Sequence, residues 1–256
     1  TYDAGWIREL FGKKKLGSTL GKRGYKKAKK IIITNPDTFS IVKKHPEIFN
    51  KKTVFIPFAI DPDYYKPSDK ILPESPYKLN DDELIIFCPS RHHWELKGHD
   101  KMINAFAHLV KTFPNTRLIT SSWGDDFLYS IALINKLKIS DKVTWIAPIA
   151  KQRLIEYYNH ADIVFDQFNL GSWGTSTPEA MSCEKPVLIY YNKYIKQCFG
   201  SEPPIPSVKT ENEIYELLVK LTDKKYRTDL GKKCREWTTK THNPRLVAKK
   251  HMEILE

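Results

Sequence analysis

Two basic residues, Arg91 and Lys97, lie near each other in a stretch that follows an apolar run at 84–88. A guanidinium can bind phosphate oxygens through a planar fork, and an ammonium adds a point charge. Gly98 follows, where the backbone can turn into a helix whose positive amino terminus faces the same region. The pattern therefore indicates a site for a phosphate-bearing anion, although a basic pair is equally compatible with a solvated loop.

A second loop, residues 166–176, leads from another apolar run into the start of a helix. Its last residues are small, and the backbone N–H groups of Gly174, Thr175 and Ser176 can cradle a phosphate. Glu179 falls in the first helical turn, where its carboxylate could accept hydrogen bonds from a vicinal diol such as a ribose. The alternative is that this acid only compensates the helix dipole.

Short apolar runs alternate with helical patterns along the chain and must position these loops. Strands are expected at 31–34, 54–56, 84–88, 117–121, 143–146, 163–165 and 186–190. Helices are expected at about 37–45, 99–112, 126–137, 151–159 and 177–183. This alternation predicts an α/β fold with a Rossmann-like, doubly wound parallel sheet. In such a sheet ligands bind beyond the carboxyl ends of the strands, where both loops lie.

The basic charge is concentrated at the amino terminus. The 256 residues carry a net charge of +12, and residues 1–52 hold 14 Lys or Arg and four acidic residues, so they account for +10 of it. Such a block favours a polyanion: anionic lipid headgroups, nucleic acid or a pyrophosphate-bearing substrate. Nucleic acid is disfavoured because no helix-turn-helix, zinc-finger or RNA-binding signature is present. The alternative interpretation, that the block is only a solvated basic face, is also compatible with the sequence.

The remaining composition is typical of a soluble globular protein, with 41% hydrophobic and 28% charged residues. No apolar run approaches the roughly 18 to 20 residues that a membrane span needs. The sequence begins with Thr1, which suggests a fragment or a processed chain. We expect no metal site and reduced thiols in a cytoplasmic protein, because the four cysteines lack metal-ligand spacing: Cys88, Cys183, Cys198 and Cys234.

Several short motifs follow one another across residues 54–190. They are Ile56-Pro57, Ile60-Asp61 and Pro67, then Arg91 and Lys97-Gly98, the segment 143–150, Tyr157 and Ala161-Asp162, and finally Gly174, Glu179-Ala180-Met181 and Lys185-Pro186-Val187. This ordered set resembles the family 4 glycosyltransferases, which are retaining enzymes of the GT-B fold. The resemblance implies a remnant of the N-terminal acceptor lobe (1–56), an interlobe linker (57–82), a nucleotide-sugar-binding Rossmann-like domain (83–236) and a C-terminal crossing helix (237–256).

The resemblance also implies roles for individual charged residues. Arg91 and Lys97 would neutralise the donor diphosphate and the charge that develops as the bond between sugar and phosphate breaks. That is electrostatic stabilisation without an obligatory metal or other cofactor. Glu179 matches the second Glu of the family's E-x7-E motif and would hold the nucleotide ribose.

Two loops would complete the donor site that the resemblance implies. Gly174, Thr175 and Ser176 would present backbone donors to the diphosphate, and Pro148 and Ile149 would contact the base. We therefore expect a hexosyltransferase of polysaccharide or glycolipid biosynthesis, using a nucleoside diphosphate sugar and a glycan or lipid-linked acceptor. The basic block would favour attachment to the anionic cytoplasmic face of a membrane. The alternatives are a nucleotide-sugar-binding module without transfer and, less favoured, a nucleic-acid-binding protein.

The chain departs from the family pattern in three places. The first Glu of E-x7-E falls on Gly171, which leaves the donor sugar open and raises the possibility of an inactive site. A divergent branch shares the Asp-Gln and Gly-x-Trp-Gly arrangement found here, so a variant active site is the favoured interpretation. Phe58-Ala59 replaces the linker's usual Asn-Gly. Finally, only about 55 residues precede the linker, so we expect a truncated acceptor lobe whose own residues cannot be named.

Overall fold

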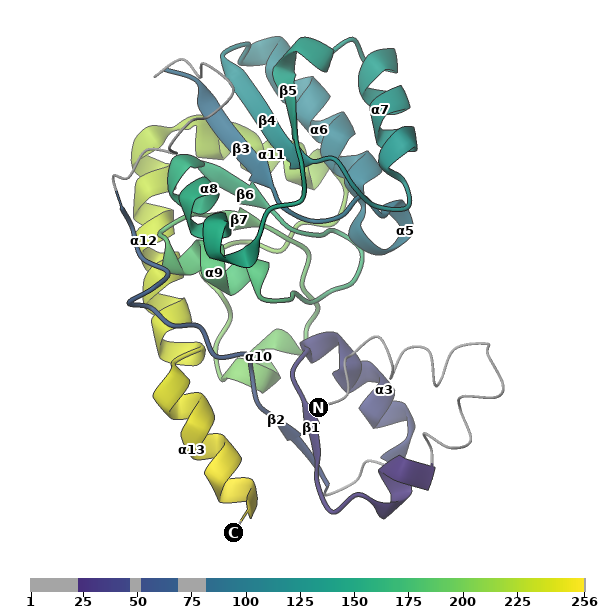
Figure 1. Cartoon of the computed structure of the whole chain (residues 1–256), viewed down its shortest axis with the longest axis vertical. Coiled ribbons are helices and arrows are strands. Elements are labelled where there is room, and N and C mark those ends of the chain that lie inside the picture. The colour runs from purple at the N-terminus through teal and green to yellow at the C-terminus, as the bar shows by residue number, and fades with distance from the viewer. Residues whose placement is uncertain (1–22, 47–51, 69–81, 256) are drawn as a thin grey trace. The chain divides into compact units, whose positions relative to one another are not determined.

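The computed structural model describes residues 23–46, 52–68 and 82–255 (Figure 1). The chain divides into two compact units. Unit 1 comprises Thr1–Ala59, Asn192–Glu202 and Thr241–Glu256, and unit 2 comprises Ile60–Tyr191 and Pro203–Lys240. The return of residues 192–202 to unit 1 was not anticipated from the sequence.

Unit 2 is built on a five-stranded sheet in which every strand is parallel to its neighbours. The strand order is β5-β4-β3-β6-β7. The bounds are β3 (Leu84–Cys88), β4 (Thr116–Ser121), β5 (Val143–Ile146), β6 (Ile163–Phe165) and β7 (Val187–Leu188). The predicted Rossmann-like α/β fold is confirmed.

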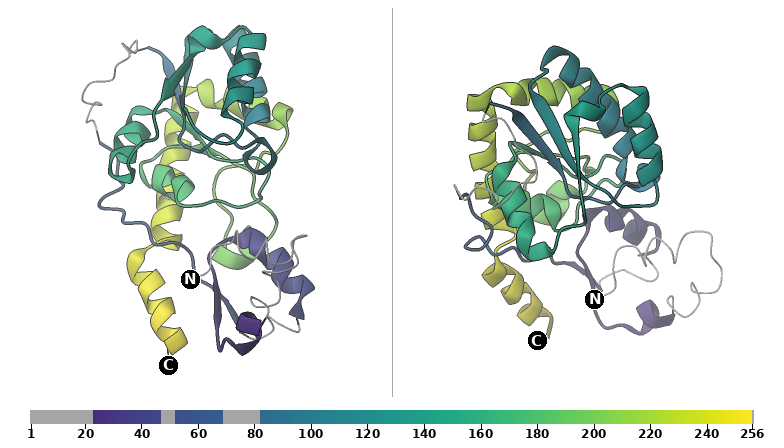
Figure 2. Two further views of the ribbon diagram at one scale, coloured as in Figure 1. Left: turned by 45° about the vertical axis from the view of Figure 1, so that its right-hand side comes forward. Right: turned by 45° about the horizontal axis from the view of Figure 1, so that its top comes forward.

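Helices cover both faces of this sheet (Figures 1 and 2). Because βαβ crossovers are right-handed, the helices that connect strands in one direction share a face. The pair on one face is α6 (His99–Thr112) and α7 (Phe127–Lys136), and the pair on the other is α8 (Leu154–His160) and α9 (Ser176–Ser182). The direction of winding reverses between β3 and β6, so a topological switch point lies between their carboxyl ends.

The core of unit 2 explains why β3 and α6 form where the sequence predicts them. Residues 85–88 of β3 are buried, as expected of a central strand covered on both faces. The α6 helix is amphipathic and buries one stripe, and α11 (Glu211–Thr222) packs against it. The α11 helix begins with a capping box between Thr210 and Glu213. The buried residues of α6 include the predicted stripe of Met102, Ile103, Phe106, Leu109 and Val110.

Several short helices punctuate the connections. They are α5 (Trp94–Lys97), η2 (Ser140–Lys142) and η3 (Lys151–Arg153). Arg91 and Lys97 were expected in a loop after the strand at 84–88, but α5 occupies part of that stretch and Lys97 is its last residue. Gly98 ends α5 and starts α6 with a φ of +69°. A Cβ there would also lie 3.1 Å from the Phe168 Cβ, so both conformation and space favour glycine.

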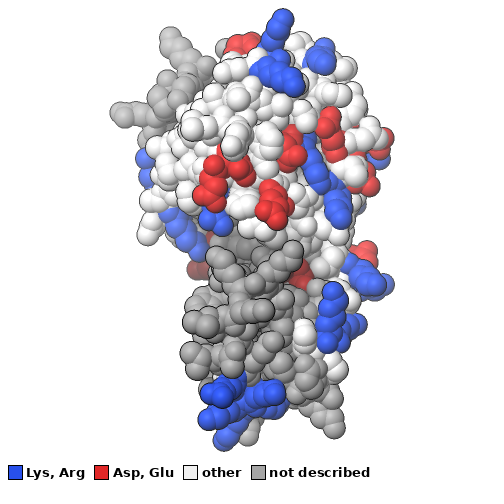
Figure 3. All heavy atoms as spheres, turned by 90° about the vertical axis from the view of Figure 1, so that its right-hand side faces the viewer, with Lys and Arg blue, Asp and Glu red and all other residues white. Residues whose placement is uncertain are grey.

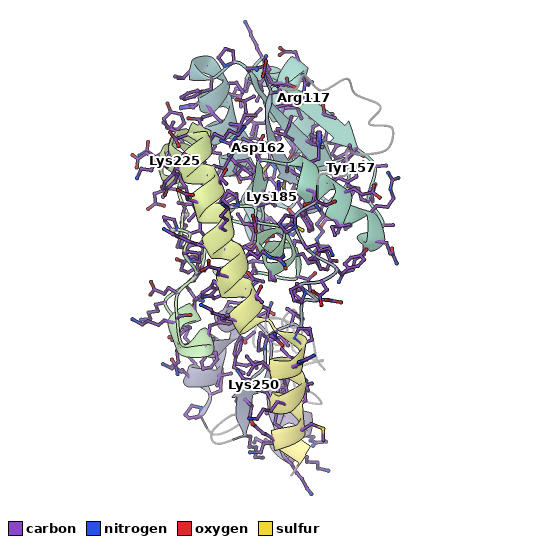
Figure 4. The ribbon with its side chains drawn as sticks, turned by 90° about the vertical axis from the view of Figure 1, so that its left-hand side faces the viewer. Arg117, Tyr157, Asp162, Lys185, Lys225 and Lys250 are labelled. Atoms are coloured by element: carbon purple, nitrogen blue, oxygen red, sulfur yellow. The ribbon has the colours of Figure 1, made fainter. Side chains whose placement is uncertain are left out.

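The long helix α12 (Lys224–Thr241) anchors the rest of unit 2. Arg227 donates to the Asp162 carboxylate at 2.9 Å, and that carboxylate also accepts from the Ile85 N–H at 2.9 Å. Figure 4 shows Asp162 beside α12. Arg235 donates to three backbone carbonyls, those of Pro62, Tyr65 and Ser182. One helix therefore binds the linker, the end of α9 and the turn before β6.

The predicted closing helix at 237–256 is two helices rather than one. Residue 237 lies inside α12, and α13 spans Pro244–Leu255. Pro244 cannot continue a preceding helix because its ring excludes the helical conformation at the residue before it. The Asn243 side chain instead accepts from the Arg245 N–H at 2.9 Å and starts the second helix.

Unit 1 has a small sheet in which β1 (Ile31–Ile33) pairs in parallel with β2 (Thr53–Phe55). Residues 23–27, η1 (Pro36–Thr38), α3 (Phe39–Lys44) and α10 (Ile195–Phe199) accompany it. Its core centres on Tyr25, Ile31 and Ile33. The Phe199 ring meets the Phe55 ring edge-on, with centroids 4.9 Å apart, which explains how α10 joins this unit.

All four cysteines are free and buried. Burial raises the pKa of Cys183, Cys198 and Cys234 to about 12, so these thiols are poor nucleophiles. Within the described part of the chain, no helix is both long enough and apolar enough to span a lipid bilayer.

Candidate functional site

The loops after β3 and β6 meet at the switch point of the sheet. The Phe168 N–H donates to the Lys97 carbonyl at 2.8 Å. The Asn169 side chain donates to the carbonyls of Trp94 and Glu95 at 2.9 and 3.0 Å. These bonds fix the two loops that the sequence analysis selected, so the basic residues of one loop and the small residues of the other belong to one edge.

Lys97 is held by a buried carboxylate that the sequence analysis did not identify. Its ammonium lies 3.2 Å from Asp166 Oδ1, and the Asp166 side chain is only 2% exposed. Thr177 donates to the other oxygen, Oδ2, at 2.6 Å. The Lys97 side chain is still 23% exposed, so it can receive an anion from solvent while Asp166 fixes its position. The available signal for Asp166 was an acid directly after the buried strand at 163–165.

Arg91 lies in the same loop but is exposed. No hydrogen bond or ion pair joins its guanidinium to any residue within the described ranges, Lys97 included. The two cations therefore differ in kind. Lys97 is pre-positioned, whereas Arg91 would have to be ordered by a ligand, at a cost in side-chain entropy.

His92 braces the loop after β3 from inside the protein. It is fully buried, with Nδ1 2.8 Å from Ser130 Oγ and Nε2 3.1 Å from Thr120 Oγ1. Burial lowers the pKa of His92 to about 4, so the ring is neutral near pH 7. A neutral ring needs one donor and one acceptor among its partners, and hydroxyls supply both.

His99 links the same loop to Asp166. Its Nδ1 accepts from the His93 N–H at 3.3 Å, so the proton of the neutral ring must lie on Nε2. Nε2 is 3.1 Å from Ser90 Oγ, and Ser90 in turn donates to the Asp166 carbonyl at 3.3 Å. Burial, with smaller contributions from His92 and Lys97, lowers the His99 pKa. Since His99 donates to Ser90, this pair is a structural chain and not a base with its nucleophile.

The loop after β6 is closed by the buried side chain of Gln167. Its amide nitrogen donates to the carbonyls of Ser172 and Tyr190, and its oxygen accepts from the Leu170 N–H at 2.7 Å. Gly171 lies inside this closed loop with a φ of +76°, a left-handed conformation that favours glycine. The left-handed backbone therefore explains why glycine, and not the first Glu of the motif, occupies position 171.

Gly174, Thr175 and Ser176 follow as the entry to α9. Gly174 is exposed and the other two are half-buried. Thr175 has a helical backbone conformation and makes no side-chain cap. Among the described residues, no backbone acceptor is found for the three N–H groups, which are therefore open donors. Contact with a phosphate remains a prediction.

Glu179 is buried rather than a surface acid, with 1% of its side chain exposed. Tyr158 donates to Oε2 at 3.3 Å, and the Lys151 ammonium lies 3.2 Å from Oε1. This contact is an ion pair, and Oε1 accepts no hydrogen bond from the residues that the structure describes. Burial, followed by the charge of Glu179, raises the pKa of Tyr158. Compensation of the helix dipole alone does not account for a carboxylate so deeply placed.

Pro148 and Ile149 follow β5, the strand at one edge of the sheet. Pro148 is exposed and Ile149 is half-buried. Their contact with a base remains a prediction. Two residues near Glu179 were not identified from the sequence: Lys151, at the start of η3 after this loop, and Tyr158, inside α8. No pattern of spacing marks them, because their contact with Glu179 depends on the fold of the α8 segment. No group of His, Cys, Asp and Glu able to hold a metal ion occurs among the described residues.

A relative from Stackebrandtia nassauensis, a D-inositol 3-phosphate glycosyltransferase, is 27% identical over 146 residues. The match covers 54% of this chain and 33% of the relative, so the chain spans about a third of the length of that curated protein.

Solved structures share the fold at low sequence identity. Sucrose-phosphate synthase from Thermosynechococcus elongatus superimposes with a TM-score of 0.76 at 19% identity, covering 98% of this chain and 64% of the other. HepE from Anabaena, solved with UDP and glucose, gives a TM-score of 0.75 at 15% identity, covering 97% of this chain and 67% of the other. Both likenesses support the fold.

A family model described as glycosyl transferases group 1 matches residues 73–237. The matched stretch contains the loops after β3, β5 and β6, and hence every candidate site residue considered above. It covers well over half of the sequence. The chain therefore belongs to the glycosyl transferases group 1 family.

Proposed function

We propose that unit 2 binds the diphosphate and ribose of a nucleoside diphosphate sugar for a glycosyl transfer reaction. The observation that carries this proposal is the open oxygen of Glu179. A buried carboxylate oxygen without a hydrogen bond from the described residues calls for a donor from outside. A ribose diol supplies such donors, and Lys97 and Arg91 lie in a loop at the same edge of the sheet for the diphosphate.

The chemistry in this proposal is electrostatic. As the bond between the sugar and the diphosphate breaks, negative charge develops on the leaving diphosphate. Lys97, positioned by Asp166, and Arg91 stabilise that charge together with the N–H groups of Gly174, Thr175 and Ser176. In this scheme the protein's own cations supply the positive charge, so no metal is obligatory.

The donor and acceptor classes follow from the resemblance and are part of the proposal. The reaction is transfer of a hexosyl group, with retention of its anomeric configuration, to a glycan or lipid-linked acceptor. The Anabaena HepE structure contains UDP and glucose, which makes UDP and UDP-glucose the first ligands to test. Pro148 and Ile149 contact the base in this scheme.

The basic residues of unit 1 give the proposal a second part, attachment to an anionic membrane surface on the cytoplasmic side. Lys26, Lys27, Lys29 and Lys30 are exposed, while residues 13–15 and 22 lie outside the described residues. Each exposed Lys near an anionic surface adds about 1 kcal/mol, screened by salt. Co-sedimentation with anionic vesicles at low salt, and its loss with neutral vesicles, is the expected result. A nucleic-acid-binding role for these residues has less in its favour, since the sequence carries no recognisable nucleic-acid-binding signature. The face of unit 2 in Figure 3 carries acidic and basic side chains together, so it offers no uniformly basic surface there either.

Calorimetry with UDP tests the nucleotide site directly. We expect binding by the native chain and weaker binding after Glu179→Gln, with no change after Lys136→Ala, a control on the exposed end of α7. Incubation with UDP-glucose and a panel of glycan and lipid-linked acceptors then tests transfer. Nucleotide binding without product from any acceptor would favour the alternative, a nucleotide-sugar-binding module.

A further inference from the structure

Lys151 and Glu179 form an unequal ion pair at the carboxyl edge of the sheet. The Glu179 side chain is 1% exposed, whereas that of Lys151 is 62% exposed. The lysine therefore lies on the solvent side of the pair and reaches inward, so that its ammonium is 3.2 Å from Oε1. An ion pair with an exposed partner contributes little free energy to folding. Stability alone therefore does not account for the position of Lys151.

The hydrogen-bonding capacity at this point is incomplete. Tyr158 donates to Oε2, and Oε1 accepts no hydrogen bond from the described residues. The Tyr65 hydroxyl also lies near this carboxylate, and burial, followed by Glu179, raises the pKa of Tyr65. The Lys151 ammonium is paired with Oε1 by charge but is not hydrogen-bonded to it, and it can still donate its protons to a ligand. A free acceptor and a free donor therefore lie side by side.

A hydroxyl group completes this arrangement because it is both a donor and an acceptor. Its proton can go to Glu179 Oε1, while its oxygen accepts a proton of the Lys151 ammonium. Both bonds involve a charged partner, which makes them stronger than bonds between neutral groups. A ligand without that hydroxyl leaves the two charged groups facing each other as they do in the free protein.

We propose that Lys151 is a second ribose ligand, which donates to the same hydroxyl that Glu179 accepts from and thereby selects ribonucleotides over deoxynucleotides. This inference rests on the proposed nucleotide site and adds a specificity-determining residue to it. Lys151 lies at the start of η3, directly after the loop of Pro148 and Ile149. The ribose and the base would therefore be read by one continuous segment.

The test compares UDP, 2′-deoxy-UDP and 3′-deoxy-UDP by calorimetry with the native chain and with Lys151→Met. Methionine keeps the length of the side chain and removes its charge and donors. Arg153→Met is the matched control, because Arg153 is a half-exposed cation of the same 3₁₀ helix whose partner is Glu156 at 3.3 Å. Thermal melts of each variant establish that unit 2 is folded.

We expect Lys151→Met to weaken UDP binding about five- to twentyfold, as for a partly exposed hydrogen bond to a charged group. For one of the two deoxy nucleotides the same substitution should change affinity less than about twofold, since the shared hydroxyl is already gone. Arg153→Met should leave all three affinities unchanged. Equal weakening of all three nucleotides by Lys151→Met, or none, would overturn the role of Lys151.

Failure of the nucleotide site and failure of the Lys151 role give different results. If the native chain does not bind UDP, or if Glu179→Gln leaves UDP affinity unchanged, the proposed nucleotide site is wrong and Lys151 falls with it. If Glu179→Gln weakens binding while Lys151→Met does not alter the preference among the three nucleotides, only the role of Lys151 is wrong.

Discussion

Asp166 and Glu179 are both buried carboxylates that face a lysine ammonium at 3.2 Å, yet their surroundings differ. Asp166 receives Lys97 on one oxygen and Thr177 on the other. Glu179 receives Tyr158 on one oxygen, and its other oxygen accepts no hydrogen bond from the described residues. A satisfied carboxylate holds a structure together, whereas an unsatisfied one is available to a ligand. The comparison therefore separates Asp166, which positions Lys97, from Glu179, the carboxylate that we propose as a ribose ligand.

The largest expected effect is on stability at Asp166. Asp166→Ala removes the partner of Lys97 and the acceptor of Thr177, and breaking a buried pair of this kind costs about 2–4 kcal/mol of unfolding free energy. Urea denaturation measures the change. Thr177→Val, which removes only one neutral donor, should cost about 1 kcal/mol. Equal losses in the two variants would contradict the central role of the carboxylate.

Lys97 should matter more for binding than for the fold. Lys97→Ala removes a charge-assisted contact to the diphosphate and should weaken UDP binding by about 1.5–3 kcal/mol. Arg91→Ala tests the same anion from a side chain that is not pre-positioned and should have the smaller effect. Calorimetry compares the two variants, and an unchanged affinity after Lys97→Ala would remove Lys97 from the site.

Acidification should destabilise the protein through His92, which is buried behind the loop that carries Lys97. Burial lowers the pKa of His92 to about 4, so the folded chain resists a proton that the unfolded chain takes up near pH 6.5. Stability should therefore fall as the pH drops from about 6.5 towards 4, by about 2 kcal/mol for this group between pH 7 and pH 5.

His242 in unit 1 also has a pKa lowered to about 4 by burial, so the His92 contribution is taken as a difference between variants. His92→Gln keeps polar contacts to Ser130 and Thr120 but cannot titrate. Its unfolding free energy should change less with pH than that of the native chain. Parallel profiles for the two proteins would exclude His92 as a source of the pH dependence.

The smallest expected change in stability is at Glu179. Glu179→Gln should lower UDP affinity by about 1–2 kcal/mol, because a neutral amide is a weaker acceptor for the ribose. Its unfolding free energy should change by less than about 1 kcal/mol, since the partner Lys151 is largely exposed. A large loss of stability with unchanged UDP affinity would instead make Glu179 a structural carboxylate like Asp166. A nucleotide-bound structure with the ribose far from Glu179 would contradict its role as a ribose ligand.

The sequence was sufficient to predict the parallel sheet and to select the two loops that meet at its carboxyl edge. The run at 84–88 and the amphipathic stripe of α6 carry that information locally, in burial and periodicity. The partners of the charged residues were not predictable in the same way. Lys97 meets Asp166 across 69 residues of sequence, and such a contact depends on the packing of two βαβ units. The α5 turn was missed because four residues are too few to show a period.

The left-handed backbone at Gly171 has a consequence for how this sequence could change over evolutionary time. A residue with a longer side chain there, Glu included, would raise the energy of the native state by about 1–2 kcal/mol, because its Cβ crowds the backbone. A single substitution of Gly171 by Glu would therefore destabilise the protein. The hydrogen bonds by which the Gln167 side chain shapes the turn would have to change first. We therefore expect substitutions at the two positions to depend on each other. Sequence surveys that require both glutamates of E-x7-E would pass over proteins with this turn, whereas the pair Gln167 and Gly171 would find them.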